Sequence, residues 1–163
     1  RIGVLGGSVD FAGAPYYAGM AALRAGAELL YLCTAEEATG PIKGYSPELM
    51  VSSVYRYSRI SEAATSQMEQ DAFVQKMVDV LPRLHALCIG PGLGRHAAVH
   101  DAVARVIEEA KKRELPLVID ADGLWLVTER PELVRGYTKA VLTPNLMEYR
   151  RLAGAVCGNE AAG

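Results

Sequence analysis

The chain has 163 residues, of which half are hydrophobic and 22% are charged, and its formal net charge is −2. This length suffices for one domain with its own core, and the composition excludes an intrinsically disordered chain. The small net charge gives no electrostatic case for a nucleic-acid partner or a membrane surface, and no apolar run approaches the roughly 20 residues that span a bilayer.

The ends and the cysteines bear on the compartment. Arg1 leads directly into a strand-like run without a visible signal peptide, so we expect the natural N-terminus to precede Arg1. Any targeting segment would lie there too, and the expected compartment is the cytoplasm or the mitochondrion. Cys33, Cys88 and Cys157 lie far apart and form no CxxC, which predicts reduced thiols, with Cys33 and Cys88 buried in strands.

Strand-like and helix-like segments alternate along the chain. The predicted strands are 2–6, 28–33, 49–54, 84–90, 115–119 and 139–143. The predicted helices are 13–26, 68–80, 97–111, 123–129 and 145–153. The periodicity is clearest in the helix over 97–111, where Val99, Val103 and Ile107 share one face. The segment from Pro41 to Pro47 is predicted to be a loop.

The predicted strands are apolar throughout rather than alternating in polarity. This pattern favours a mostly parallel sheet covered by helices on both faces, in which ligands bind outside the carboxyl ends of the strands. Glycine and polar residues follow four of these strands. They are Gly6-Gly7-Ser8, the GPGLGR segment over 90–95, Asp120-Ala121-Asp122-Gly123 and the TPNLME segment over 143–148.

Each of these loops also has an ordinary structural interpretation. Asp122 could accept backbone N–H groups as the cap of a helix beginning at Gly123, and Asn145 with Glu148 could form a capping box. GPGLGR is a weak anion-site pattern, because it is neither GxGxxG nor a Walker A loop and Pro91 lacks an N–H donor.

Taken together, the motifs resemble one family. The segments are, in order, GGSVDFAGAPYYAG, YSPEL, LPRLHAL, GPGLGR, VIDADGLWLV and KAVLTPNLMEYRRL. They resemble the eukaryotic ATP-dependent NAD(P)H-hydrate dehydratases of the ribokinase-like superfamily, over nearly the whole chain. The resemblance implies a three-layer α/β/α fold with a mostly parallel sheet. It also implies a lyase that uses ATP and Mg²⁺ to dehydrate the (6S)-hydrates NADHX and NADPHX to NADH and NADPH, giving ADP and phosphate.

The resemblance also implies that part of the domain is missing. The family's GxGD segment, which carries the catalytic aspartate, and its lysine-bearing ATP-binding strand do not occur in this sequence. We therefore expect 1–163 to be an incomplete ribokinase-like dehydratase domain, truncated at its C-terminus, that lacks the C-terminal half with the ATP site and is inactive alone.

The family's substrate positions map onto two glycines, the start of the first helix and one run near the end of the chain. They are Gly92, Gly94, Gly13, Ala14, Asn145, Leu146, Met147, Glu148, Tyr149, Arg150 and Arg151. Asp120 and Asp122 are candidate magnesium ligands. Asp122 is also the candidate catalytic group, and we expect it, rather than Asp120, to face the site.

Two other functions stay open. One is a different ribokinase-like small-molecule kinase, which would release a stable phosphorylated product, and the other is a non-catalytic nucleotide-binding domain. The expected partner is a small nucleotide substrate, with no nucleic acid and no membrane. A truncated sheet would expose an unpaired edge and apolar faces, which favours a homo-oligomer.

Overall fold

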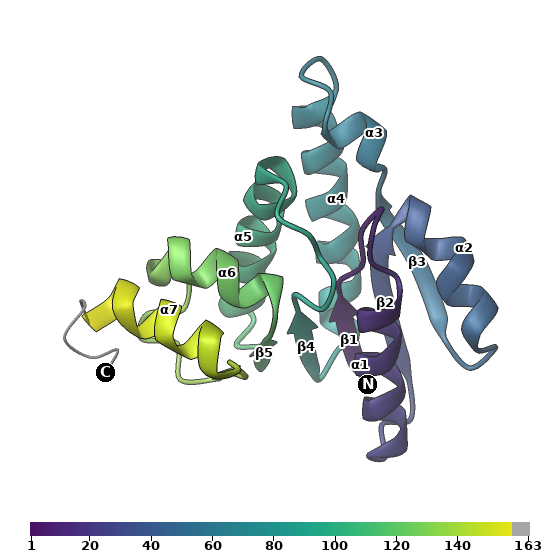
Figure 1. The fold of residues 1–163 in the computed structure, drawn as a ribbon. Coiled ribbons are helices and arrows are strands. Elements are labelled where there is room, and N and C mark those ends of the chain that lie inside the picture. Colours follow the sequence, from purple (N-terminus) through teal and green to yellow (C-terminus); the bar gives the residue numbers. More distant parts are fainter. Residues whose placement is uncertain (158–163) are drawn as a thin grey trace.

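A six-stranded sheet lies between two layers of helices in the computed structural model, which describes residues 1–157 (Figure 1). The strands are β1 (Ile2–Leu5), β2 (Leu30–Ala35), β3 (Met50–Tyr55), β4 (Ala86–Ile89), β5 (Leu117–Ile119) and β6 (Ala140–Leu142). They follow the order β3-β2-β1-β4-β5-β6, and all neighbouring pairs are parallel. The predicted mostly parallel sheet is therefore confirmed.

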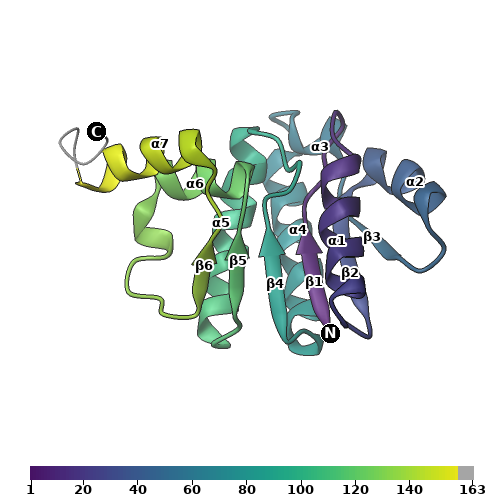
Figure 2. The ribbon, with the colours of Figure 1, turned by 60° about the horizontal axis from the view of Figure 1, so that its bottom comes forward.

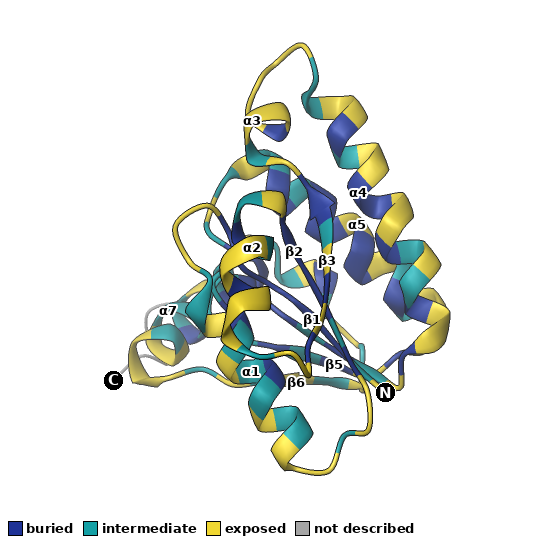
Figure 3. Cartoon of the chain, turned by 90° about the vertical axis from the view of Figure 1, so that its right-hand side faces the viewer, coloured by how far each residue is buried: buried dark blue, intermediate teal, exposed yellow. Residues whose placement is uncertain are grey.

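Helices connect the strands and cover them. They are α1 (Gly13–Arg24), α2 (Glu36–Tyr45), α3 (Tyr57–Ile60), α4 (Ser66–Val80), α5 (Ala97–Lys112), α6 (Asp122–Glu129) and α7 (Leu146–Cys157). In Figure 2, α1 lies in front of the sheet, and α4 and α5 lie behind it. Figure 3 shows buried residues concentrated in the strands and on the inner sides of α4 and α5. None of the described helices is long and apolar enough to cross a membrane.

The predicted loop from Pro41 to Pro47 is wrong, because Pro41 lies inside α2. A proline inside a helix costs about 3 kcal/mol, which is why the sequence indicated a loop. Tertiary packing outweighs this cost, since Ala38 and Ile42, one helical turn apart, are buried against the sheet. The topology also requires a crossover here, because β2 and β3 are parallel neighbours.

Glycines bring the carboxyl ends of β1, β4 and β5 into contact. Gly90 has a φ of +121°, and a Cβ atom on it would overlap the carbonyl oxygen of Asp120. A Cβ atom on Gly6 would likewise overlap the carbonyl oxygen of Pro91. The strand order places its switch point between β1 and β4, where such sheets bind ligands. The close contacts between these main-chain segments therefore form the edge of the sheet where the sequence predicts the site.

Beside α1, one face of the sheet is uncovered in the described part of the chain (Figure 2). Val4, Cys88, Val118 and Val141 are neighbours in register across β1, β4, β5 and β6. Helix α1 packs on Val4, whereas Cys88 and Val118 are half-buried and Val141 is 58% exposed. A groove of about 630 Å³ is lined by Val4, Cys88 and Val118 of this row, and we call it the sheet-face groove.

The cysteines provide a test of this packing. Burial raises the pKa of the Cys33 thiol to about 12, so this thiol stays protonated at pH 8. Because the thiolate is the reactive form, iodoacetamide is expected to label the exposed Cys157 and to spare Cys33 in the folded protein. Peptide mass spectrometry measures the labelling, with urea-unfolded protein as the control. Equal labelling of Cys33 and Cys157 before unfolding would contradict the buried position.

Candidate active site

The loop between β4 and α5 carries Gly92 and Gly94, with φ values of +64° and +76°. The Gly94 peptide is held on both sides. Its N–H donates to Asp122 Oδ2 at 2.9 Å, and its carbonyl oxygen accepts from Nε2 of the buried His100 at 3.0 Å. These bonds come from two different helices, so the loop is fixed in one conformation at the edge of the sheet.

Asp122 links the loop after β5 to the glycine loop. Its other oxygen, Oδ1, accepts from Arg95 Nε at 3.1 Å, and the side chain is 17% exposed. The N-cap residue of α6 is Ala121, with no side-chain capping bond, so the interpretation of Asp122 as a helix cap is wrong. The carboxylate instead reaches across to a loop that lies 28 positions earlier in the sequence.

Two arginine side chains pack on the Trp125 ring beside this loop. The Arg95 guanidinium lies 4.0 Å from the centroid of the Trp125 ring, and that of Arg151 lies 4.6 Å from it. A guanidinium over an aromatic face is attracted by the ring quadrupole. Arg95 is therefore held by both Asp122 and Trp125, and α7 contributes a second positive group to the same place.

The two carboxylates after β5 turn toward different neighbours. Ala121 between them has a φ of +48°, a conformation that is costly for a residue with a Cβ atom. Asp120 accepts from Thr143 Oγ1 at 2.9 Å, whereas Asp122 faces the glycine loop. Within residues 1–157, no three His, Cys, Asp or Glu side chains are gathered to hold a metal ion. Magnesium binding at Asp120 and Asp122 stays a prediction.

The start of α1 lies against the same loop. A Cβ atom on Gly92 would be 3.3 Å from the Cβ of Ala14, which adjoins Gly13 at the first turn of α1. A hollow of about 390 Å³ opens between these elements, and we call it the outer hollow. It is lined by Asp10, Phe11, Gly92, Gly94, Arg95 and Asp122.

The run from Asn145 to Arg151 is only partly directed toward the outer hollow. Asn145 Oδ1 accepts from the N–H groups of Met147 and Glu148, and a Glu148 carboxylate oxygen accepts from Asn145 N–H at 2.8 Å. The predicted capping box is therefore confirmed. Of the seven residues, Arg151 reaches the Trp125 cluster.

Four members of the run lie elsewhere. Leu146 and Met147 are exposed on the first turn of α7, and Arg150 is exposed on the next turn. Tyr149 lines a separate apolar groove of about 350 Å³ between α6, β6 and α7. Substrate contacts for these residues stay predictions.

Replacing Asn145 with alanine is expected to cost about 1 kcal/mol of stability, because two N–H groups of α7 lose their acceptor. Asn145→Asp keeps an acceptor and is the matched control, with a cost expected near zero. Urea unfolding measures both. Equal stability of N145A and N145D would show that the cap does not contribute. If Asn145 also contacts substrate, N145D loses activity without losing stability.

Several residues of this edge were not singled out as site residues from the sequence. Arg95 and Ser8 each follow a glycine segment at the end of a strand, which was an available signal. No sequence signal marked Tyr55 and His96, because their position at the site depends on how β3 and α5 pack. These four residues line one small hollow, which shares Arg95 with the outer hollow.

The fold and this edge define a three-layer, parallel α/β protein whose candidate site lies at the carboxyl end of the sheet, with a fixed glycine loop and two stacked arginines. The fold resembles that of a ribokinase-like superfamily protein from Enterococcus faecalis, with a TM-score of 0.73 and 25% identity over 94% of this chain and 48% of that one.

Residues 2–162 match the profile of the NAD(P)H-hydrate dehydratase family, and the chain belongs to this family. This confirms the resemblance of the motifs.

Two further relatives agree with the family assignment. The ATP-dependent (S)-NAD(P)H-hydrate dehydratase of Rattus norvegicus is 47% identical over 96% of this chain and 42% of its own length. The Bacillus subtilis ADP/ATP-dependent NAD(P)H-hydrate dehydratase, co-crystallised with ATP/Mg²⁺ and soaked with CoA, is similar with a TM-score of 0.61. It is 27% identical over 94% of this chain and 48% of that one. The chain thus spans less than half the length of the curated relatives it matches.

Proposed function

We propose that this chain is the hydrate-binding part of an ATP-dependent NAD(P)H-hydrate dehydratase. The reaction is the dehydration of (6S)-NADHX or NADPHX at the expense of ATP, with ADP and phosphate as products. The observation that carries the proposal is the glycine loop fixed by Asp122 beside two arginines, in a chain of this family. The names of the rat and B. subtilis proteins support the same activity.

The arrangement suits a substrate rich in phosphate. Phosphoryl transfer asks the protein mainly for positioning and for neutralisation of charge. Arg95 and Arg151 supply positive charge, and the 16-residue helix α5, which begins at Ala97 just after the glycine loop, adds the positive end of its dipole. Asp122 acts as a positioning residue in this proposal, since both of its oxygens are engaged by Gly94 and Arg95.

ATP and Mg²⁺ belong to the proposed reaction, but the described residues do not form a magnesium site by themselves. When bound, ATP supplies the phosphoryl group that makes the hydrate's hydroxyl a leaving group. We propose that residues outside 1–163 hold ATP and cover the sheet-face groove, and that 1–163 is an incomplete domain. The coverage of less than half of each relative and the exposed Val141 support this. Self-association through the open sheet stays a proposal, as does a cytoplasmic or mitochondrial compartment.

The test is a repair assay on the protein as its gene encodes it and on residues 1–163 side by side. Each is given NADHX or NADPHX with ATP and Mg²⁺, and the dihydronicotinamide absorbance is followed. Recovery by the gene's full product alone supports the proposal. A stable phosphorylated product without recovery would show another kinase instead. Nucleotide binding without any reaction would show a non-catalytic domain.

A further inference from the structure

A second, smaller hollow of about 80 Å³ adjoins the outer hollow, and we call it the inner hollow. The two share Asp10, Gly94 and Arg95 in their linings. The other lining residues of the inner hollow include Ser8, Tyr55, Tyr57, Leu93, His96 and Val99. These residues come from the ends of β1 and β3 and from the beginning of α5, so the hollow lies at the edge where the sheet binds ligands.

Three residues that line this hollow each carry a buried polar atom with no hydrogen-bond partner among the described residues. These atoms are Ser8 Oγ, Tyr55 Oη and His96 Nδ1. Ser8 is 6% exposed and Tyr55 is 1% exposed. Buried polar groups are nearly always paired, because an unpaired one forfeits the hydrogen bonds it makes with water. Such a concentration of unpaired groups in one lined hollow indicates a place for an incoming polar group.

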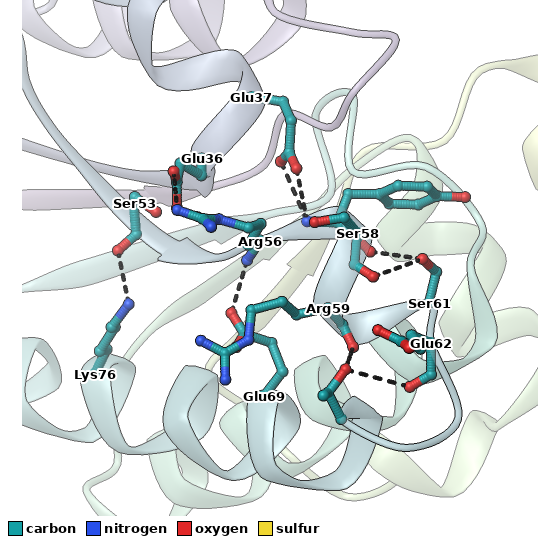
Figure 4. A network of polar contacts seen from close by, with 12 residues as sticks. Glu36, Glu37, Ser53, Arg56, Ser58, Arg59, Ser61, Glu62, Glu69 and Lys76 are labelled. Atoms are coloured by element: carbon teal, nitrogen blue, oxygen red, sulfur yellow. Dashed lines mark hydrogen bonds and ion pairs between the residues drawn. The ribbon is translucent and has the colours of Figure 1, made fainter.

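The wall that carries the tyrosines is held by charged groups outside the hollow (Figure 4). Glu37 of α2 accepts the N–H of Tyr57 at 2.9 Å, and Glu69 of α4 accepts the N–H of Arg56 at 2.8 Å. Arg56 also donates through Nε to Glu36 at 2.9 Å. Three glutamates from two helices, α2 and α4, therefore fix the short segment between β3 and α3.

Aromatic contacts fix the same wall from inside. The Tyr55 ring stacks on Phe73 with 5.1 Å between centroids, and the Tyr57 ring meets the His96 ring edge-on at 5.5 Å. Burial, with smaller contributions from Glu37 and Tyr57, raises the pKa of Tyr55, so its phenol stays neutral and can donate a hydrogen bond. The hollow is thus preformed rather than assembled around a ligand.

We propose that the inner hollow is a subsite for a neutral polar group of the substrate, either the nicotinamide carboxamide or a ribose hydroxyl. This inference rests on the proposed function. Hydroxyls and an imidazole both donate and accept, which matches an amide or an alcohol. The volume compares with about 30 Å³ for one water molecule, so a small polar group fits. In this proposal the phosphates are bound by Arg95, which lines the outer hollow, and by Arg151, which stacks on the same Trp125 ring.

The test compares Tyr55→Phe and Ser8→Ala with wild type in the protein as its gene encodes it. Thr34→Val is the matched control, because Thr34 Oγ1 is also buried and unpartnered but lies beside Gly7, outside the lining of the hollow. Y55F and S8A are each expected to raise KM for NADHX by about 3- to 10-fold, the effect of one lost hydrogen bond, whereas T34V does not. Each removes an unpaired hydroxyl, so thermal stability is expected to hold.

Substrate analogues distinguish the nicotinamide carboxamide from a ribose hydroxyl as the group that occupies the hollow. The hydrate of the 3-acetylpyridine analogue of NADH lacks the amide nitrogen, and deoxyribose analogues lack one hydroxyl each. If the carboxamide occupies the hollow, wild type discriminates against the acetyl analogue and Y55F discriminates less. If a ribose hydroxyl occupies the hollow, wild type discriminates against the deoxyribose analogue that lacks this hydroxyl, and Y55F discriminates less. Unchanged KM and unchanged discrimination in both variants would overturn the subsite and leave buried water as its occupant.

If the proposed function is wrong, the assay gives a result that differs from failure of the subsite. In that case wild type restores no NADH from any hydrate, whatever the variants do. The subsite is then judged by calorimetric binding of NADPH to wild type, Y55F and T34V. Weaker binding by Y55F alone supports the subsite, and equal affinity of all three proteins overturns it.

Discussion

Replacing Asp122 with alanine is expected to lower kcat/KM for NADPHX by about 100-fold in the protein as its gene encodes it. The Gly94 N–H would lose its acceptor and Arg95 would lose its ion pair, so the glycine loop would no longer be held where the substrate binds. Misplacement by about 1 Å at a reacting centre is enough for a loss of this size. The sheet does not depend on this carboxylate, and the fold is expected to persist.

Two controls separate position from charge at Asp122. Asp101→Ala removes a carboxylate of α5 that pairs with Arg130 at 2.6 Å outside both hollows, and its activity is expected to stay at the wild-type level. Asp122→Asn keeps an oxygen acceptor for Gly94 but lacks the charge, so an intermediate activity is expected. Hydrogen exchange of residues 92–96 is expected to accelerate in D122A. Wild-type kcat/KM and wild-type exchange in D122A would contradict the positioning role.

Replacing Gly90 with alanine is expected to destabilise the protein by at least about 4 kcal/mol. Two effects combine there. The φ of +121° disfavours any residue with a Cβ atom, and the added methyl group would overlap the Asp120 carbonyl and the Gly123 backbone. Neither neighbour can move at low cost, because both are main-chain atoms, one in the loop after β5 and one in the first turn of α6.

Gly26→Ala isolates the backbone effect. Gly26 has a comparable φ of +106°, but nothing lies within 4 Å of the position its Cβ would take. The expected cost is about 1–2 kcal/mol, which is the conformational penalty alone. Urea unfolding measures the loss of stability in both variants. The difference between the two losses is the cost of the contact between the added methyl group on residue 90 and the main chain of Asp120 and Gly123. Equal destabilisation would mean that the ends of β4 and β5 are not packed as the structure has them.

The sequence predicted the fold where local pattern and topology agree. Apolar strands alternating with helices indicated a parallel three-layer protein, and the spacing of Asn145 and Glu148 indicated the capping box, since a cap depends only on neighbours in sequence. Helix α2 was missed because Pro41 is a strong local signal against a helix, and the burial of Ile42 that outweighs it is tertiary.

The site was predicted less completely, because its contacts join distant segments. Nothing in the sequence between Gly94 and Asp122 indicates their hydrogen bond, which depends on the glycine contact between two strand ends. The stacking of Arg95 and Arg151 on Trp125 likewise needs α6 and α7 to pack side by side. Asp122 was therefore predicted as a functional residue without its partner.

The most direct test of where the substrate binds is hydrogen–deuterium exchange on the protein as its gene encodes it, with and without NADPHX. Binding at the carboxyl end of the sheet predicts slower exchange in residues 92–96 and 120–125, and in the first turns of α7 around Arg151. The sheet-face groove near His85 is expected to show no change. Protection confined to that groove, with unchanged exchange in the glycine loop, would contradict the assignment of the site.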